Sequence, residues 1–321
     1  MRRRALVVGL AVAAVAVIAG GSLLLLLARA QGSPERLQAR KGRLVAVDAQ
    51  RLGEDAISSI DALTLRSSTG LTVHARVRVP REERPPYAGV ALLGGVKRGS
   101  RIVTTPGLDV IARSAVLVAL DYPLKPSRNP WKSLEALTLM LRLRPAAFDT
   151  VAAALLLLDY LETRADVARD RMFLVGGSLG AVAVTVAGGV DPRPAAVVAL
   201  YGGAALGSLV THTLEHPDQG VPYAHWQAVT LGYGLAWLLT PLEPARYAGR
   251  IAPRPFIMIN GEGDTLVPRA NVLALFEAAR LPKELVWVAG EHVQPSETKL
   301  LESVSGLVAT RLAARGVLSP R

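Results

Sequence analysis

The sequence contains no cysteine, and this absence excludes several kinds of chemistry at once. Disulfide bonds, thiolate metal sites and a cysteine nucleophile are all ruled out. The absence does not identify the compartment, because proteins without disulfides work on either side of a membrane. The chain also has no long low-complexity tract and no repeat of solenoid period, so a disordered or repeat protein is not expected.

Acidic and aromatic residues are both scarce. There are 26 Asp and Glu against 37 Lys and Arg, and aromatic residues make up 5% of the chain. A nucleic-acid surface would need a basic stripe with aromatic side chains on which bases stack. The basic residues are instead spread along the chain, except at Arg2–Arg4 and between Arg36 and Arg43. No nucleic-acid partner is therefore expected.

Half of the 321 residues are apolar, and the longest uncharged run lies at the N-terminus. Ala5 to Ala28 follow three arginines, and a helix of 24 residues rises roughly 36 Å, enough to cross a hydrocarbon core of about 30 Å. We expect residues 1–30 to be a signal-anchor or transmembrane segment in the lipid bilayer. Ala28-Arg29-Ala30 has the form of a cleavage site, so secretion after cleavage at Ala30 is the alternative. A buried core helix is disfavoured, because the segment is apolar on all sides.

The orientation of this segment is indicated by charge. The leading arginines favour a cytoplasmic N-terminus, whereas the basic residues between Arg29 and Arg43 argue for the opposite. The basic start, apolar core and A-x-A pattern together are typical of an export signal. We therefore expect an extracytoplasmic domain, with residues 31–60 as a linker that has room for a short helix, and 61–321 as the folded unit.

The folded unit begins with a predicted β-hairpin and continues with short apolar runs. Residues 62–66 and 71–79 alternate apolar and polar side chains around a Ser-Ser-Thr-Gly turn, as hairpins do. Continuous apolar runs of this kind are typical of parallel strands buried on both faces. The runs are 89–93, 115–120, 172–175, 195–200, 256–260 and 285–288.

Helical patterns separate these strands. They cover 145–161, with proline at its start, and then 179–187, 269–280 and 296–315. A hairpin followed by alternating strands and helices predicts an α/β fold, with a mostly parallel sheet and helices on both faces. Residues 203–244 interrupt the alternation. We interpret them as a helical cap insertion over the carboxyl edge of the sheet, with a continuous core helix at 225–240 as the alternative.

A G-x-S-x-G motif stands where one of the predicted strands meets a helix. Gly176-Gly177-Ser178-Leu179-Gly180 follows the run 172–175 and precedes the helical pattern 179–187. This strand–turn–helix context is the one in which such a serine is exposed as a nucleophile. The flanking Gly176 and Gly180 leave room where strand and helix approach closely.

A serine nucleophile needs a base and an acid. His292 follows the last predicted strand, and Asp264 lies in the loop after the preceding one, which is the chain order Ser…Asp…His. The carboxylate would fix the histidine tautomer and stabilise its charged form. Glu262 is a nearby competitor for this role, and a turn-stabilising function is the alternative for Asp264.

These pieces resemble the α/β-hydrolase superfamily, especially its esterase, dienelactone-hydrolase-like and prolyl-oligopeptidase-like branches. The matching stretches are GGSLG at 176–180, GEGDTLVP at 261–268 and GEH at 290–292. Backbone N–H groups usually form the oxyanion hole of such enzymes, which here implies Leu179 together with Gly95 or Val96. Relatives often carry histidine before these glycines, and this chain has Leu93. No metal or organic cofactor is implied.

The resemblance predicts a serine hydrolase that cleaves a carboxylic ester or related acyl bond of a small molecule through an acyl-enzyme. Six large side chains of the insertion either line an apolar acyl pocket or pack on the core: Trp226, Leu231, Tyr233, Leu235, Trp237 and Leu238. Two alternatives differ in class. His212-Thr213-Leu214-Glu215-His216 matches the inverted zinc-peptidase pattern, and a catalytically inactive, membrane-anchored binding protein would retain the fold alone.

Overall fold

The computed structural model describes residues 32–81, 85–95, 98–124, 134–217, 222–293 and 297–318, with the backbone alone for 134–141. The membrane segment expected at residues 1–30 therefore lies outside the described residues. Within them, no helix is both long and apolar enough to cross a bilayer.

A single sheet organises the described part of the chain. Its nine strands follow the order β1-β2-β3-β5-β4-β6-β7-β8-β9. β1, β2, β3 and β5 pair antiparallel in succession, whereas the pairs from β5 through β4 to β9 are parallel. The strands are β1 (Leu44–Glu54), β2 (Ser58–Ser67), β3 (Thr72–Pro80), β4 (Tyr87–Leu93), β5 (Ala115–Leu120), β6 (Val167–Gly177), β7 (Ala196–Leu200), β8 (Phe256–Gly261) and β9 (Lys283–Val288).

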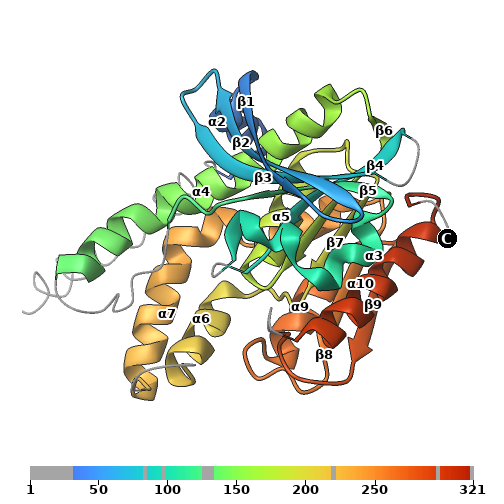
Figure 1. The fold of residues 1–321 in the computed structure, drawn as a ribbon. Coiled ribbons are helices and arrows are strands. Elements are labelled where there is room, and N and C mark those ends of the chain that lie inside the picture. Colours follow the sequence, from blue (N-terminus) through green and yellow to red (C-terminus); the bar gives the residue numbers. More distant parts are fainter. Residues whose placement is uncertain are drawn as a thin grey trace, which may run out of the picture.

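Helices cover both faces of this sheet, as Figure 1 shows. The larger apolar cluster joins one sheet face to α2 (Pro34–Lys41), α4 (Leu134–Thr163), α5 (Leu179–Val190), α8 (Ala245–Ile251) and α9 (Arg269–Ala278). The second cluster joins the other face to η1 (Gly99–Thr104), η2 (Pro106–Leu108), α3 (Asp109–Ala112) and α10 (Thr298–Ala313).

Strand β4 illustrates why the parallel strands read as continuous apolar runs. Tyr87, Ala91 and Leu93 belong to the first cluster, whereas Val90 and Leu92 belong to the second. Successive side chains point to opposite faces of a strand, and here both faces are buried under helices. The predicted α/β architecture, the hairpin β2–β3 and the six parallel strands are confirmed.

Two predictions about the chain were wrong. The expected linker at 31–60 contains helix α2 and strand β1, which extends the sheet by pairing with β2. β1 escaped detection because it is an edge strand with mostly exposed side chains, and it lacks the apolar alternation of a half-buried strand. Helix α4 begins at Leu134 rather than at Pro145, which lies inside it, since a long packed helix tolerates one lost hydrogen bond.

Residues 203–244 form a helical pair instead of one core helix. α6 (Leu206–Glu215) and α7 (His225–Leu239) lie side by side at one end of the molecule (Figure 1). Their backbones approach closely, because a β-carbon at Gly232 would lie 2.3 Å from Thr211 Oγ1. Only Ala228 and Gly232 of α7 are buried, so this helix is not part of the core.

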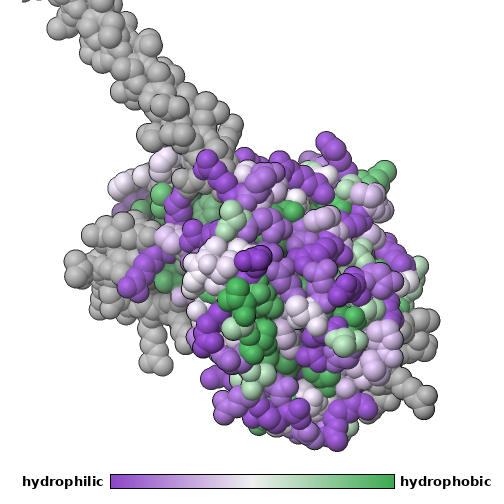
Figure 2. Space-filling model, turned by 90° about the horizontal axis from the view of Figure 1, so that it is seen from above, coloured by the Kyte–Doolittle hydropathy of each residue, from purple (hydrophilic) through white to green (hydrophobic). Residues whose placement is uncertain are grey.

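The surface is mostly polar. Seen from above, hydrophobic side chains gather in a narrow stripe among polar ones (Figure 2). The exposed large apolar side chains include Val45, Val47 and Leu52 on the edge strand β1, and Trp226, Tyr233 and Trp237 on α7. Scattered residues of this kind are normal, and the group on α7 is discussed below.

A buried arginine ties the antiparallel hairpin to the second helical layer. Arg78 on β3 is 3% exposed, and its guanidinium donates to Asp55 Oδ2 at 2.8 Å and to Asp109 Oδ1 at 2.7 Å. It also donates to Ser58 Oγ at 2.6 Å and to the Val103 carbonyl at 3.3 Å. Because Val103 belongs to η1 and Asp109 to α3, one side chain positions the segment that borders the cavity described below.

We expect Arg78→Ala to lower the free energy of unfolding by about 2 kcal/mol, because the buried Ser58 hydroxyl and Val103 carbonyl lose their donor and two partly exposed carboxylates lose their partner. Arg76→Ala, on the same strand but only partly buried, should change it by less than about 0.5 kcal/mol. Urea denaturation of the two variants measures both values. Equal, small losses in the two variants would show that Arg78 does not hold the layers together.

Candidate active site

Ser178 occupies a sharp turn between strand β6 and helix α5. Its backbone has φ 56° and ψ −119°, a conformation that residues with a β-carbon rarely adopt. The Ser178 N–H donates to the Leu200 carbonyl at 2.9 Å, and its own carbonyl accepts from the Ala181 N–H at 2.9 Å. These bonds hold the strained residue in place, and strain that is over-determined in this way is typical of functional sites.

The two glycines of the motif are needed for packing. A β-carbon at Gly176 would lie 2.2 Å from the Gly180 carbonyl oxygen, and one at Gly180 would lie 2.0 Å from the Leu93 carbonyl oxygen. Strand β6, helix α5 and the end of β4 therefore meet without space for a side chain. Gly177 differs, since a β-carbon there meets no atom within 4 Å.

His292 and Asp264 form a buried pair at the carboxyl end of the sheet. His292 Nδ1 lies 2.8 Å from Asp264 Oδ2, and the two side chains are 9% and 2% exposed. The other carboxylate oxygen accepts from the N–H groups of Leu266 at 2.8 Å and Val267 at 3.0 Å. Because the carboxylate accepts, Nδ1 carries the proton, and Nε2 of a neutral ring remains an acceptor.

The structure pairs His292 with Asp264, and the competitor Glu262 is exposed at the same loop. The Glu262 N–H donates to the Val288 carbonyl at 2.9 Å, which joins the loops after β8 and β9. The Gly263 N–H likewise donates to the Gly290 carbonyl at 3.0 Å. The two loops that carry the acid and the histidine are thus bonded through their backbones.

Tyr201, which the sequence analysis did not select, supports the histidine. It directly follows β7, has φ 51° and is fully buried, and its ring lies edge-on to His292 with centroids 5.2 Å apart. Burial raises the pKa of Tyr201 to about 12, and the charges of Asp264 and Glu297 add to this effect. Its position at a strand end beside Gly202-Gly203 is the only signal that the sequence offers.

The loop after β4 is held against the site by residues that follow β5. The Tyr122 hydroxyl donates to the Gly94 carbonyl, and Asp121 Oδ1 accepts from the Ser100 N–H at 2.9 Å. Burial raises the pKa of Tyr122, which keeps the phenol a donor. Gly95 reaches the same cavity as Ser178, whereas Val96 lies outside the described residues.

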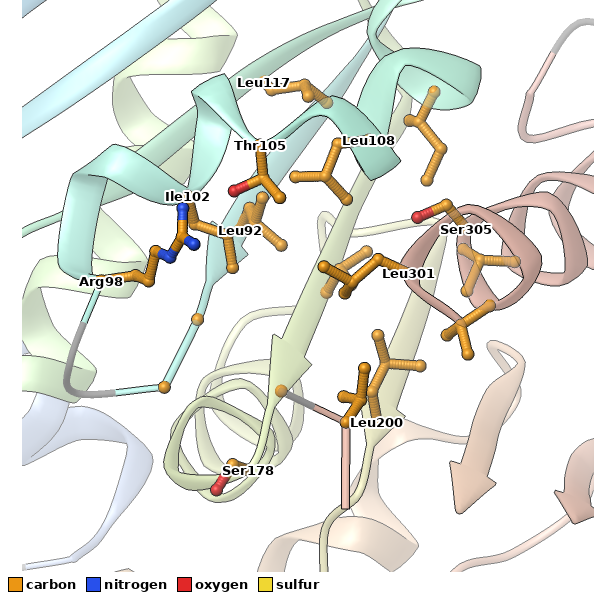
Figure 3. Close-up of a pocket in the computed structure, with 18 of the residues that line it drawn as sticks. Leu92, Arg98, Ile102, Thr105, Leu108, Leu117, Ser178, Leu200, Leu301 and Ser305 are labelled. Atoms are coloured by element: carbon orange, nitrogen blue, oxygen red, sulfur yellow. The ribbon is translucent and has the colours of Figure 1, made fainter. Parts of the chain in front are cut away.

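Ser178, His292 and Gly95 line one cavity of about 290 Å³. It extends from the carboxyl edge of the sheet into the space between the sheet and the second helical layer (Figure 3). Most of its wall is hydrocarbon, and Thr105 contributes a buried hydroxyl that has no hydrogen-bond partner among the described residues.

The insertion contributes nothing to this wall within the described residues, which contradicts the first of the two alternatives for its large side chains, that they line an acyl pocket. The cavity is lined instead by strands, by the η1–η2–α3 segment and by α10. Three aromatic residues of α7 point to solvent, with Trp226 69%, Tyr233 57% and Trp237 48% exposed. The pattern of an amphipathic helix does not reveal which of its neighbours borders a cavity.

The segment His212–His216 makes contacts that account for its polar side chains. His212 Nε2 lies 2.8 Å from the Thr265 carbonyl, and the His216 ring stacks on His212 with centroids 4.5 Å apart. Glu215 pairs with His225 across the helical pair. In the part of the chain that is described, no group of three or more His, Asp or Glu side chains is placed to hold a metal ion. The segment therefore ties α6 to the loop of Asp264.

We expect Gly180→Ala to unfold the domain or destabilise it by about 3 kcal/mol, because the added methyl overlaps the Leu93 carbonyl. Gly177→Ala adds the same methyl at a position where no other atom lies within 4 Å. This variant should keep the wild-type free energy of unfolding within about 0.5 kcal/mol. Thermal unfolding followed by circular dichroism compares the two. A stable Gly180→Ala protein would contradict the packing described here.

The chain matches no protein-family model and no curated protein sequence. Solved structures do resemble it. Acetyl xylan esterase from Paenibacillus sp. R4 has a TM-score of 0.62 at 15% identity, over 85% of this chain and 92% of that one. Acetyl xylan esterase 1 from Thermoanaerobacterium sp. JW/SL YS485 has a TM-score of 0.59 at 14% identity, over 84% and 92%. The methylesterase BT1017 has a TM-score of 0.59 at 20% identity, over 90% of this chain and 64% of that one.

At such identities the likeness concerns the fold alone. The order of the strands, the helices on both faces and the strand–turn–helix around Ser178 agree with it. The protein has the fold of the α/β-hydrolase superfamily.

Proposed function

We propose that this protein is a serine hydrolase that cleaves a carboxylic ester, with Ser178 as nucleophile, His292 as base and Asp264 as the acid that orients it. The observation that carries the proposal is the buried His292–Asp264 pair at 2.8 Å, whose histidine lines the same cavity as the strained Ser178. The esterases among the structural neighbours support ester hydrolysis as the reaction class.

In the first step, Ser178 Oγ attacks the ester carbonyl while His292 Nε2 takes the hydroxyl proton. Asp264 accepts the Nδ1–H of His292 and stabilises the imidazolium that forms. The two backbone N–H groups that bind the other oxygen of Asp264 keep its carboxylate in place. His292 then donates its proton to the leaving alcohol, and an acyl group remains on Ser178.

The negative charge that develops on the carbonyl oxygen needs preorganised donors. The Leu179 N–H lies at the start of α5, where helical N–H groups have no acceptor within the helix and the helix dipole favours an anion. A second donor would come from Gly95 or Val96, on the loop that Tyr122 holds through Gly94. Water activated by His292 would release the acyl group, and no cofactor takes part in this sequence.

Ser178→Ala should lower kcat/KM on p-nitrophenyl esters by about 10⁴-fold or more, because the covalent step is lost. Asp264→Asn should lower kcat by about 10⁴-fold with the fold intact, because the amide favours the wrong histidine tautomer. A fluorophosphonate probe should label the wild type at Ser178. A folded wild-type protein without label or turnover would favour the alternative, a binding protein that retains only the fold.

We further propose that residues 1–30 anchor the hydrolase to a membrane, with the folded domain outside the cytoplasm. Gly32, the first described residue, accepts a hydrogen bond from the Tyr247 hydroxyl, which also donates to the Pro241 carbonyl at 2.6 Å. The chain therefore enters the domain next to the carboxyl end of α7, where Trp237 is exposed. Aromatic side chains of this kind favour the membrane–water interface.

Protease added to intact spheroplasts should digest the domain if this orientation is correct, and the N-terminal segment should remain in the membrane fraction. A cytoplasmic marker protein in the same sample must stay intact as the control. Digestion of the domain only after lysis would overturn the orientation. Release of a soluble domain that starts after Ala30 would replace the anchor with secretion.

A further inference from the structure

We propose that the ester's acyl group is an unbranched hydrocarbon chain of about eight to ten carbons, which lies in the cavity beneath the sheet. The inference rests on the proposed function, because it takes Ser178 as the atom that carries the acyl group. It goes further by assigning the substrate class from the shape and chemistry of the cavity wall.

One wall of the cavity is the sheet itself. Val90 and Leu92 of β4 line it, and so does Gly94, which follows the strand; this alternation is the spacing at which side chains point to one face. Val175 and Gly177 line it in the same way on β6. These two rows run parallel to each other and end at the carboxyl edge of the sheet, beside Ser178. The wall is therefore a straight groove that leads away from the nucleophile.

The opposite wall comes from two segments that are far apart in the sequence. Ile102, Leu108 and Ile111 belong to the η1–η2–α3 segment, whereas Leu301 and Val304 belong to α10. In Figure 3, Ser178 lies at one end of the group of side chains, and Leu117 and Leu108 lie at the other. Side chains thus stand on both sides of the cavity along its length, with Ser178 at one end.

The chemistry of these walls selects a hydrocarbon. Among the described residues, three polar side chains join Ser178 and His292 in the lining, namely Arg98, Thr105 and Ser305. A sugar or peptide group placed here would lose its hydrogen bonds to water and find few replacements, which is costly in a buried site. Each methylene group that enters the cavity instead raises the affinity for the acyl chain by about fourfold, the factor expected for its transfer out of water.

The length of the groove sets the length of the chain. Gly94 is four residue steps beyond Val90, a distance of about 13 Å at the usual rise per residue of a strand. An extended chain of single bonds advances about 1.2 Å per bond, so roughly ten carbons fit along this wall. The volume agrees, because about 290 Å³ is roughly twice that of a cavity that binds benzene. An acetyl group would leave most of this space empty.

The test compares selectivity for the length of the acyl chain in the wild type and in one variant of the cavity wall. Val308 lines the cavity two turns beyond Leu301 on α10, and Val308→Phe should fill part of the space that the acyl chain would occupy. Val317→Phe is the matched control, since Val317 is buried in the same cluster but does not line the cavity. The measurement is kcat/KM on p-nitrophenyl esters whose acyl groups have two, four, eight, ten and sixteen carbons. These lengths lie below, within and above the proposed range.

We expect the wild type to prefer the eight- and ten-carbon esters over the acetate by about 100-fold or more. In Val308→Phe the ratio of kcat/KM for the ten-carbon ester to that for the acetate should fall at least about tenfold, and Val317→Phe should keep the wild-type ratio. A wild type that prefers the acetate, or a ratio that both variants change equally, would overturn the inference.

A binding experiment separates this inference from the proposed function. Sodium decanoate should raise the melting temperature of Ser178→Ala by about 2 °C or more at saturating concentration, whereas sodium acetate should not. The result requires no turnover, so it remains decisive if no ester is hydrolysed or if Val308→Phe fails to fold. Decanoate binding without hydrolysis would refute the proposed ester hydrolysis and support the cavity as a site for an acyl chain. Ester hydrolysis without any stabilisation by decanoate would support the proposed function and refute the assignment of the acyl chain to this cavity.

Discussion

The contact that the rest of the site depends on is the one between Gly180 and the Leu93 carbonyl. No side chain fits there or between Gly176 and Gly180, so β4, β6 and α5 meet through backbone alone. This approach forces Ser178 into its strained turn and brings the loop of Gly94 and Gly95 within reach of it. Ser178, the start of α5 and the proposed oxyanion donors are thereby placed by a single steric constraint.

The second element of the site is set by hydrogen bonds rather than by close packing. The loops after β8 and β9 are bonded through Glu262 and Gly263, and this backbone pairing presents Asp264 to His292. Tyr201 fills the space beside the ring with an aromatic edge. His292 is thus held by a charged partner on one side and an apolar one on another, which suits a base that must gain and lose a proton in one orientation.

The two faces of the sheet have different tasks in this molecule. The face covered by α4, α5, α8 and α9 is packed densely and carries the larger apolar cluster. The other face, under η1–η2–α3 and α10, retains the cavity that reaches Ser178. Arg78 ties this layer to the hairpin, which lets the wall stay in place although the space behind it is not filled. An empty apolar cavity costs stability, and ligand binding is the usual reason to keep one.

The sequence alone predicted the parallel strands and the hairpin, because apolar runs and alternation are local patterns. A glycine-flanked serine and two loops that follow strands also led to Ser178, Asp264 and His292, whose catalytic roles stay a prediction. It did not reveal β1, because the side chains of this edge strand are mostly exposed and do not alternate between apolar and polar. Nor did it reveal that α4 begins before Pro145. Tyr201 and the cavity were decided by the tertiary structure. The cavity wall combines β4 and β6 with η1–α3 and α10, and whether such distant segments touch or leave a gap between them depends on how whole layers pack.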